Sequence, residues 1–434
     1  MNQFSEFPFS TVVQHNLKRH GFETPTPVQA QAIPPGMAGR DLVATAQTGT
    51  GKTLAFLLPI LEKMIAQRSE VSGVTRRPIR ALVLSPTREL AMQIAETWHK
   101  LVEGTEFRGA IVVGGLSETT QLNAIRRGVD MVIATPGRLE DFLSRRLIDL
   151  GSVSVLALDE ADRMLDMGFL PAIEKILAKL PSARQNLFFS ATMDNAVSGL
   201  IARHSRDAVR IAVGGTQNQA ADQVELHWYE IEKDRKVGLL RWMLEQEEGA
   251  FLVFARTKHG ADRLAKSLSQ AGAKAAAIHG NRTQNQRNQA LDGFREGRYR
   301  VLVATDVVAR GIHVDSVAHV VNFDLPQAPQ DFIHRIGRTG RAGQSGTATT
   351  FSTSSERGEI RRIERECRVS LVRRRDTGET PEAKHLELFE PADQRPHRTA
   401  GHHAAKGASQ NGAPGGFRPK RSFGRANAKA SGRR

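Results

Sequence analysis

Short apolar runs recur along the first half of the chain and alternate with amphipathic stretches. These runs are Leu42–Ala46, Ala81–Ser85, Ala110–Gly114, Met131–Thr135, Val153–Leu158, Leu187–Ser190 and Val209–Val213. Continuous Val, Ile and Leu runs of this length are typical of parallel strands that are buried on both faces. The stretches between them, such as Leu54–Ile65 and Pro171–Lys179, are long enough for crossover helices, and Pro171 suits a first helical turn. The pattern predicts a doubly wound α/β sheet whose ligands gather at the carboxyl ends of its strands.

The second half repeats this alternation after a polar, glycine-containing break at residues 214–223, which we expect to be a flexible linker. Its apolar runs are Val224–Ile231, Phe251–Ala255, Ala275–His279, Val301–Thr305, Val317–Asn322 and Ala348–Ser352. This half has no phosphate-binding loop of its own, so we expect it to complete the site of the first half. The predicted division is an N-terminal region at 1–30, a first domain at 31–213, a second domain at 224–375 and a tail at 376–434.

The distribution of charge sets the end of the chain apart. The net charge is +15, and residues 395–434 contribute ten Lys and Arg but no Asp or Glu, which leaves 51 basic and 46 acidic residues elsewhere. A segment so rich in Gly, Ala, Ser and Asn cannot bury enough apolar surface to offset its ordering entropy, so we expect a disordered tail. A basic tail suggests a polyanion such as nucleic acid as partner. A solubilising tail without a specific partner is the alternative.

Composition also argues against secreted and membrane proteins. No apolar run approaches the ~20 residues needed to span a bilayer. The first residues, Met1–Phe7, lack the basic and apolar regions of a secretory signal. Cys367 is the single cysteine, so an internal disulfide is excluded and a reducing compartment is favoured. We therefore expect a cytoplasmic protein without a membrane partner.

A glycine-rich segment follows the first apolar run. It consists of Ala46, Gln47, Thr48, Gly49, Thr50, Gly51, Lys52 and Thr53, all of which we expect to contact a nucleotide. Gly49 and Gly51 permit backbone angles that turn N–H groups toward phosphates. Lys52 supplies a charge for the β- and γ-phosphates, and the Thr53 hydroxyl is placed to bind Mg²⁺. Ala46 stands where the strict pattern has glycine, and a simple glycine-rich turn is the alternative.

Two carboxylates follow the run Val153–Leu158. Asp159 is expected to hold Mg²⁺ through water, and Glu160 to orient or deprotonate the attacking water. Carboxylates are also favourable at a helix N-terminus, which is the alternative interpretation. That alternative does not account for a strand followed by two acids downstream of a phosphate loop, so we expect an ATPase that uses ATP and Mg²⁺.

Two arginines of the second half, Arg338 and Arg341, are expected to lie side by side. They are three residues apart in His-Arg-Ile-Gly-Arg-Thr-Gly-Arg, which places them on one face of a helix or turn. Neighbouring arginines need an anion, and a γ-phosphate held by the first domain would serve. Arginine fingers of this kind accelerate hydrolysis by about 10³–10⁵. A basic surface for RNA, or a salt bridge, is the alternative.

With these motifs in this order, the chain resembles the DEAD-box ATP-dependent RNA helicases, and within them the bacterial RhlE-like group, from Phe4 to Ser352. The segment Gly21–Gln29 is similar to the adenine-reading Q motif, and Phe4 to the isolated upstream aromatic of the family. Asp159–Phe169, which reads Asp-Glu-Ala-Asp-Arg-Met-Leu-Asp-Met-Gly-Phe, is especially typical. The resemblance implies two tandem RecA-like domains, with Phe4 and Gln29 at the base of the nucleotide.

The resemblance also implies residues that contact RNA and residues that couple the two activities. The RNA contacts it implies are Pro86, Thr87, Arg88, Glu89, Leu90, Gly114, Gly115, Thr135, Pro136, Gly137, Arg138, Arg256, Thr257, Gln284, Arg287, Thr305 and Asp306. Ser190 and Thr192 are similar to the motif that couples hydrolysis to strand separation. Gly311 and His313 fall where the family contacts the nucleotide. His313 replaces the usual Asp, and because neutral imidazole still offers one hydrogen bond, we expect a modest effect on nucleotide affinity.

We therefore expect an ATP-dependent RNA helicase that separates short duplexes or remodels RNA–protein complexes with low sequence selectivity. Ribosomal or mRNA-decay ribonucleoprotein components are conceivable partners. One alternative is an ATP-gated RNA clamp that holds partners and unwinds little. Another is a DNA-directed translocase, which the Q motif and the residues Ala161 and Asp162 disfavour.

Overall fold

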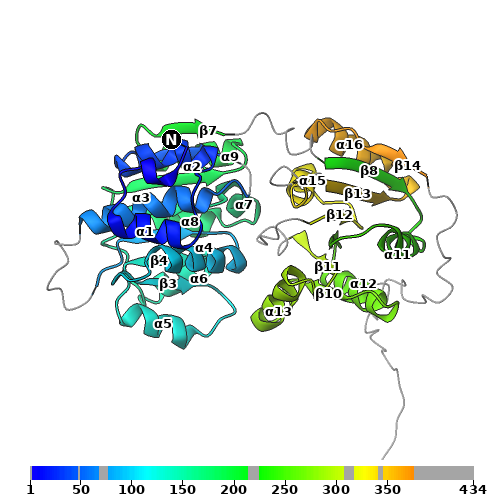
Figure 1. The fold of residues 1–434 in the computed structure, drawn as a ribbon, viewed down its shortest axis with the longest axis horizontal. Helices are drawn as coiled ribbons and strands as arrows, with labels where there is room; N and C mark the ends of the chain where they lie inside the picture. The colour runs from blue at the N-terminus through cyan, green and yellow to red at the C-terminus, as the bar shows by residue number, and fades with distance from the viewer. Residues whose placement is uncertain are drawn as a thin grey trace, which may run out of the picture. The chain divides into compact units, whose positions relative to one another are not determined.

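Two parallel seven-stranded sheets make up the fold (Figure 1). The structure is a computed structural model that describes residues 2–46, 49–67, 77–213, 224–306, 317–340 and 346–375. We call residues 2–213 the first lobe and residues 224–375 the second lobe. The predicted linker and the predicted disordered tail both lie outside the described residues.

The first lobe has the strand order β3-β4-β2-β5-β6-β1-β7, and its paired strands are parallel. Its strands are β1 (Leu42–Thr45), β2 (Ala81–Leu84), β3 (Gly109–Val112), β4 (Met131–Ala134), β5 (Val155–Leu158), β6 (Gln185–Ser190) and β7 (Val209–Ala212). Its helices are η1 (Phe4–Glu6), α1 (Thr11–Arg19), α2 (Pro27–Met37), α3 (Lys52–Ala66), α4 (Arg88–Leu101), α5 (Glu118–Arg126), α6 (Pro136–Ser144), α7 (Ala161–Asp166), α8 (Leu170–Leu177) and α9 (Asn195–His204).

Alternation along each strand divides the core of this lobe into two layers. Ala81 and Val83 of β2 pack in a cluster with α1 to α4, whereas Leu82 and Leu84 pack in a second cluster with α5 to α9. Successive side chains of a strand point to opposite faces, so each strand serves both layers. Because both faces are covered, groups that bind ligands are left to the strand ends, where the loops begin.

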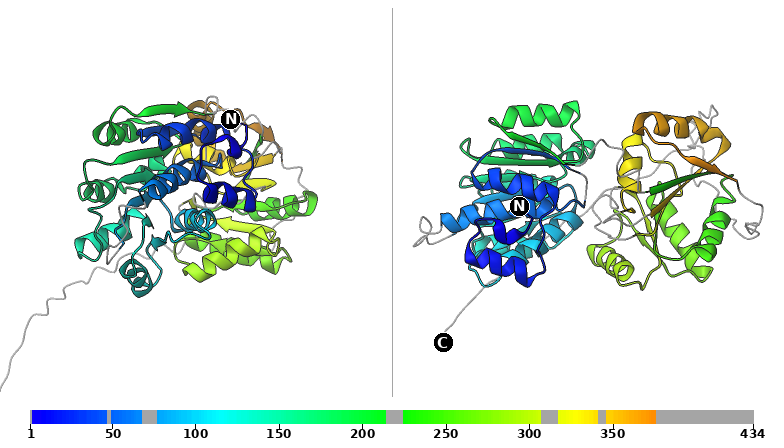
Figure 2. Two further views of the ribbon diagram at one scale, coloured as in Figure 1. Left: turned by 60° about the vertical axis from the view of Figure 1, so that its left-hand side comes forward. Right: turned by 45° about the horizontal axis from the view of Figure 1, so that its top comes forward.

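The second lobe has the corresponding order β10-β11-β9-β12-β13-β8-β14, again parallel. Its helices and strands run from green to orange in Figure 2. Its strands are β8 (Val224–Glu230), β9 (Phe251–Phe254), β10 (Ala275–Ile278), β11 (Val301–Ala304), β12 (His319–Asn322), β13 (Gly346–Ser352) and β14 (Val372–Arg374). Its helices are α11 (Lys236–Gln246), α12 (Lys258–Gln270), α13 (Gln284–Arg295), α15 (Pro329–Ile336), η3 (Ser354–Glu356) and α16 (Arg357–Cys367).

These sheets confirm the doubly wound α/β fold that the apolar runs predict. Every run predicted as a strand coincides with one, and Pro171 lies in the first turn of α8. Strand β6 begins at Gln185, two residues before the predicted run, and the edge strand β14 was not predicted. No helix in the described part of the chain is long and apolar enough to cross a bilayer.

Candidate functional site

The phosphate loop lies between the end of β1 and the start of α3. Gly49 and Gly51 have φ angles of +89° and +86°, which favour glycine. Helix α3 begins at Lys52, so Thr53 lies in its first turn. The backbone N–H groups of this first turn form a cradle for an anion. Buried Nζ of Lys52 donates to the carbonyl oxygen of Ala46 at 2.9 Å, which holds the ammonium across the loop. Gln47 and Thr48 lie outside the described residues.

The predicted base reader, Gln29, is attached to this loop. Its Nε2 donates to the carbonyl oxygen of Gly51 at 2.8 Å, and its Oε1 accepts from the backbone N–H of Thr26 at 2.8 Å. A Cβ at Gly51 would collide with the Gln29 amide, so glycine is needed there for close approach as well as for its φ angle. The structure therefore brings Gln29 to the end of the phosphate loop.

Phe4, the upstream aromatic expected at the base of the nucleotide, is buried among aromatic rings. Its ring centroid lies 6.0 Å from that of Phe7 and 6.5 Å from that of Phe9. Its backbone N–H donates to the carbonyl oxygen of Glu23 at 2.9 Å, which ties η1 to the Q-motif segment. Phe4, Phe22 and Glu23 line a cavity of about 470 Å³.

Asp159 and Glu160 follow β5 directly and are both buried. Burial, together with the neighbouring charges of Glu160 and Asp162, raises the pKa of Asp159 to about 7 against the opposing charge of Lys52. Burial also opposes ionisation of Glu160, but Arg163, Lys52 and Arg338 lower its pKa to about 2. Glu160 accepts a hydrogen bond from Nη1 of Arg163 at 2.5 Å. The pKa values of the two adjacent acids are therefore shifted in opposite directions, which suits different roles.

The residues beside the loop fit a hydrated magnesium ion. Oδ1 of Asp159 is buried and has no hydrogen-bond partner within the described residues, which leaves an acceptor for a metal or its water. No group of three or more His, Cys, Asp or Glu in those residues could hold a metal ion. Mg²⁺ does not need one, because it retains waters and takes one or two protein ligands with substrate phosphates. Thr53 and Asp159 match that requirement.

One of the two predicted arginine fingers lies in the described part of the second lobe. Arg338 follows α15, is buried, and donates from Nε to the carbonyl oxygen of His334 at 3.3 Å. Its charge is one of the causes that lower the pKa of Glu160. Arg341, Gly311 and His313 lie outside the described residues, so their predicted roles remain predictions.

The predicted coupling residues Ser190 and Thr192 hold the last acid of the Asp-Glu-Ala-Asp segment. Oδ2 of Asp162 accepts from the backbone N–H of Ala191 at 3.1 Å, and from the N–H and Oγ1 of Thr192 at 2.8 and 2.9 Å. The backbone N–H of Asp162 in turn donates to Oγ of Ser190 at 3.2 Å. The end of β6 is thus fixed to the start of α7, beside Glu160.

A cavity of about 290 Å³ collects most of the RNA contacts predicted for the first lobe. Its lining includes Pro86, Thr87, Arg88, Glu89, Gly114, Thr135, Gly137, Arg138, Met167, Phe169, Gly280 and Arg287. The Arg88 guanidinium lies against Gly114 and Gly115, where any Cβ would crowd or strike it. Arg138 lies over the Phe142 ring, with its guanidinium carbon 5.5 Å from the ring centroid.

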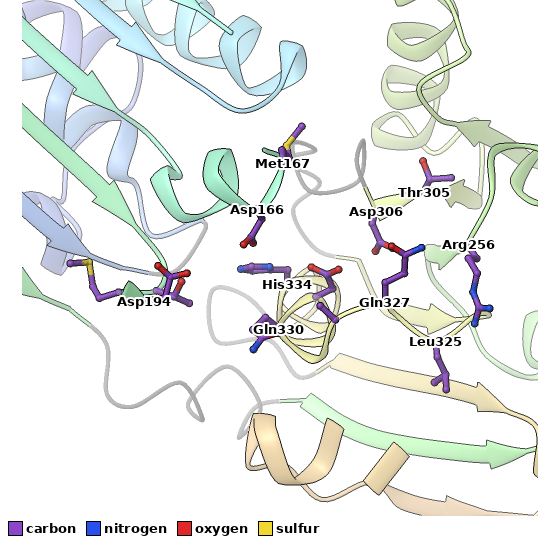
Figure 3. A pocket seen from close by; sticks show the side chains of 14 residues that line it. Asp166, Met167, Asp194, Arg256, Thr305, Asp306, Leu325, Gln327, Gln330 and His334 are labelled. Carbon is purple, nitrogen blue, oxygen red and sulfur yellow. The ribbon is translucent and has the colours of Figure 1, made fainter. Parts of the chain in front are cut away.

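A larger cavity, of about 840 Å³, contains some of the other predicted residues (Figure 3). Its lining includes Thr192, Arg256, Thr305, Asp306 and His334. The backbone N–H of Arg256 donates to a carboxylate oxygen of Asp324 at 2.8 Å, while its side chain is half exposed.

Four buried charged residues in these sites were given no individual role from the sequence, although Glu89 lies in the predicted RNA-contact segment Pro86–Leu90 and Asp162 in the Asp-Glu-Ala-Asp segment. Glu89 accepts from Nε2 of Gln284 at 2.9 Å and from Nη2 of Arg287 at 2.6 Å. Arg335 donates two hydrogen bonds to the Asp306 carboxylate, from Nε at 2.6 Å and from Nη2 at 2.7 Å. Asp162 and Arg163 complete the group. Their proximity in the sequence was the signal that could have identified them, because each lies within three residues of a residue that was assigned a role.

Two family models match the chain. The DEAD/DEAH box helicase model covers residues 26–199, and the Helicase conserved C-terminal domain model covers residues 235–343. The ATP-dependent RNA helicase CshA of Listeria monocytogenes is 41% identical over 340 residues, which are 78% of this chain and 63% of that protein. The DEAD-box ATP-dependent RNA helicase CshA of Bacillus licheniformis is 39% identical over 335 residues, 77% of this chain and 67% of the relative. The chain thus spans about two thirds of the length of these relatives.

Solved structures agree with the sequence comparisons. Dbp5 of S. cerevisiae bound to RNA and ADP BeF3 superposes with a TM-score of 0.74 at 28% identity, over 86% of this chain and 96% of that one. The DEAD-box helicase Mss116 bound to ssRNA and UDP-BeF superposes with a TM-score of 0.76 at 27% identity, over 86% and 79%.

Proposed function

The chain belongs to the DEAD-box ATP-dependent RNA helicases, and from that premise we propose that it couples ATP hydrolysis to local separation of RNA duplexes or remodelling of RNA–protein complexes. The observation that carries this proposal is the pair of buried acids after β5. Asp159 retains an unpaired buried oxygen near the Lys52 ammonium, while Glu160 stays ionised because three basic side chains act on it. This arrangement suits a metal-assisted hydrolysis with a carboxylate base.

Each residue of the nucleotide site has a role in this proposal. Lys52 and the amides at the start of α3 bind the β- and γ-phosphates, and Gln29 recognises the base next to Phe4. Thr53 and Asp159 hold Mg²⁺, which when bound neutralises the charge that develops on the phosphates.

Hydrolysis also needs the second lobe. Glu160 orients the attacking water and accepts its proton, while Arg338 stabilises the charge on the γ-phosphate. Arg341 is proposed to act with Arg338 at the γ-phosphate. Gly311 and His313 are proposed to contact the nucleotide, as the family resemblance implies.

RNA is proposed to bind through its backbone, so sequence selectivity should be low. The cavity around Arg88, Gly114 and Arg138 supplies guanidinium and backbone groups from the first lobe. The cavity around Arg256 and Thr305 supplies them from the second lobe. Ser190 and Thr192, through Asp162, connect these contacts to hydrolysis.

Two further assignments depend on composition. The basic residues of 395–434 suit loose tethering of RNA by charge, and the single Cys367 favours action in the cytoplasm. Membership of the RhlE-like group, and ribosomal or mRNA-decay partners, remain predictions.

The test compares nucleic acids and then asks for strand separation. ATP hydrolysis by the full chain should rise at least tenfold with single-stranded RNA and much less with DNA of the same sequence. Glu160→Gln should bind ATP but lose hydrolysis, by about 10² or more for a general base. Equal stimulation by DNA would overturn the RNA assignment. RNA-stimulated hydrolysis without separation of a short duplex would favour the ATP-gated clamp.

A further inference from the structure

Arg163 is a buried cation directly beside the proposed catalytic base. It lies on α7, is 3% exposed, and donates from Nη1 to Oε2 of Glu160 at 2.5 Å. Glu160 itself has a φ of +52°, an uncommon angle for a residue with a side chain. Arg163 therefore holds the carboxylate of the proposed base from one side.

The remaining donors of Arg163 are available for another acceptor. Nε and Nη2 are buried and have no hydrogen-bond partner within the described residues. Buried guanidinium donors are rarely left unpaired, because each loses its hydration without compensation. An acceptor that reaches these donors would therefore compete with Glu160 for the same cation.

Glu89 is the carboxylate placed to compete. It is 3% exposed at the start of α4, and its charge, after those of Glu160 and Asp162, opposes the burial that lowers the pKa of Arg163. Asp162 is less available, because its Oδ2 already accepts three hydrogen bonds from Ala191 and Thr192.

Glu89 is also bound by the side chains proposed to meet RNA. Its Oε1 accepts from Gln284 at 2.9 Å, and its Oε2 accepts from Arg287 at 2.6 Å. Both donors lie in the first turn of α13. Charges of alternating sign thus run from Glu160 through Arg163 and Glu89 to Arg287, all of them buried.

We propose that Arg163 is a positioning residue that couples RNA binding to hydrolysis by exchanging carboxylates. When RNA phosphates engage Arg287, Glu89 loses a partner and attracts the unpaired donors of Arg163. The hold of Arg163 on Glu160 then weakens, and the Glu160 carboxylate is released toward the attacking water. No covalent step is involved, and the inference depends on the roles proposed above for Glu160 and Arg287.

The test measures the steady-state ATPase of the full chain with and without saturating single-stranded poly(U). Glu89→Gln keeps the size of the side chain but removes the charge that attracts Arg163. It should lower the RNA-stimulated kcat about tenfold, and with it the ratio of the RNA-stimulated rate to the RNA-free rate. Arg163→Lys keeps the positive charge but loses the forked guanidinium donors, so it should also reduce the stimulation of ATP hydrolysis by RNA.

Coupling between the two positions distinguishes this exchange from a structural role. The double variant should be no worse than the worse single variant, because both changes interrupt one relay. The control is Glu96→Gln on the same helix, whose side chain is 67% exposed and pairs with Lys100. Its RNA stimulation should equal that of the wild type. Thermal unfolding and binding of a non-hydrolysable ATP analogue verify that each variant is folded.

The outcomes separate this inference from the proposed function. Full RNA stimulation of Glu89→Gln overturns the exchange, whatever Arg163→Lys does. Additive losses, or equal losses with and without RNA, overturn it as well. Hydrolysis that survives Glu160→Gln, or a wild-type enzyme that does not respond to RNA, would instead refute the proposed function.

Discussion

At Gly115 the backbone has a φ of +77°, and a Cβ built there would strike the guanidinium of Arg88. Both features favour glycine, but only the second concerns the predicted RNA contact. We expect Gly115→Ala to displace Arg88 and weaken binding of single-stranded RNA about tenfold, equivalent to about 1.4 kcal/mol. Fluorescence anisotropy with a labelled oligonucleotide measures the change.

The matched control for this substitution is Gly104→Ala. Gly104 has a φ of +73°, but a Cβ there meets nothing within 4 Å. Its alanine variant should carry a similar backbone strain, about 1–2 kcal/mol, and keep the wild-type RNA affinity. Equal RNA affinity in the two variants would show that the position of Arg88 does not matter.

Asp159 gives the nucleotide-free protein a distinct response to pH. Its folded pKa is raised to about 7, mainly by burial, whereas an unfolded Asp has a pKa of about 3.9. Between these values the folded state binds a proton that the unfolded state has lost, so the free energy of unfolding falls as pH rises. Asp159→Asn stays neutral. It should therefore unfold at a higher temperature than the wild type at pH 8, by a margin that narrows toward pH 5.

The slope of this effect has an upper limit of about 1.4 kcal/mol per pH unit. Asp149→Asn, the same substitution at an exposed position, is the control. Asp159→Asn that is less stable than the wild type at pH 8 would contradict the assignment.

Secondary-structure elements with apolar interiors were predictable, and those stabilised by polar or exposed residues were not. Strands such as β2 and β4 are buried at every position and read directly as Val, Ile and Leu runs. Strand β14 has three exposed residues, so its pairing with β8 leaves no apolar pattern. Strand β6 begins with buried Gln185 and Asn186, whose side chains replace apolar packing with hydrogen bonds.

The residues of the candidate site also divide into those that the sequence predicts and those that it does not. The loop around Lys52 and the acids after β5 were predictable, because short motifs at strand ends place their groups through the backbone alone. Arg163 lies three residues from Glu160, but its unpaired donors are apparent only in the structure. Glu89 was not predictable either, because its partners Gln284 and Arg287 lie 195 and 198 residues away. Sequence spacing carries no information on such contacts.

Gln185 shows how much a polar strand residue contributes. Its Nε2 donates to the carbonyl oxygens of Gly36 at 2.8 Å and Arg40 at 2.9 Å, which joins β6 to the end of α2. Gln185→Ala should lower the free energy of unfolding by about 2 kcal/mol, because it leaves buried carbonyls without this donor. Urea unfolding measures the loss. Gln246→Ala, at an exposed end of α11, should stay within about 0.5 kcal/mol of the wild type.

At the scale of the whole molecule, each lobe has its own apolar core. The two clusters of the first lobe contain residues from Phe4 to Ile211, and those of the second contain residues from Val224 to Leu371, with no residue in common. The proposed catalytic groups are distributed differently. Lys52 and Glu160 belong to the first lobe, whereas Arg338, whose charge acts on Glu160, belongs to the second. The lobes are therefore expected to fold separately but to hydrolyse ATP only together.

A fragment of residues 1–213 tests this division of labour. It retains both apolar clusters of its lobe and the phosphate loop, so it should unfold cooperatively and bind a fluorescent ATP analogue. It lacks Arg338 and Arg341, and an arginine finger is worth about 10³–10⁵ in rate. Its kcat should therefore fall at least about a thousandfold below that of RNA-stimulated full-length protein, and RNA should not raise it. The full chain carrying Arg338→Lys is the control for the missing lobe, because it keeps the second lobe but loses the fork that matches a phosphate. A folded fragment that hydrolysed ATP as fast as the whole chain would place the entire catalytic apparatus in the first lobe.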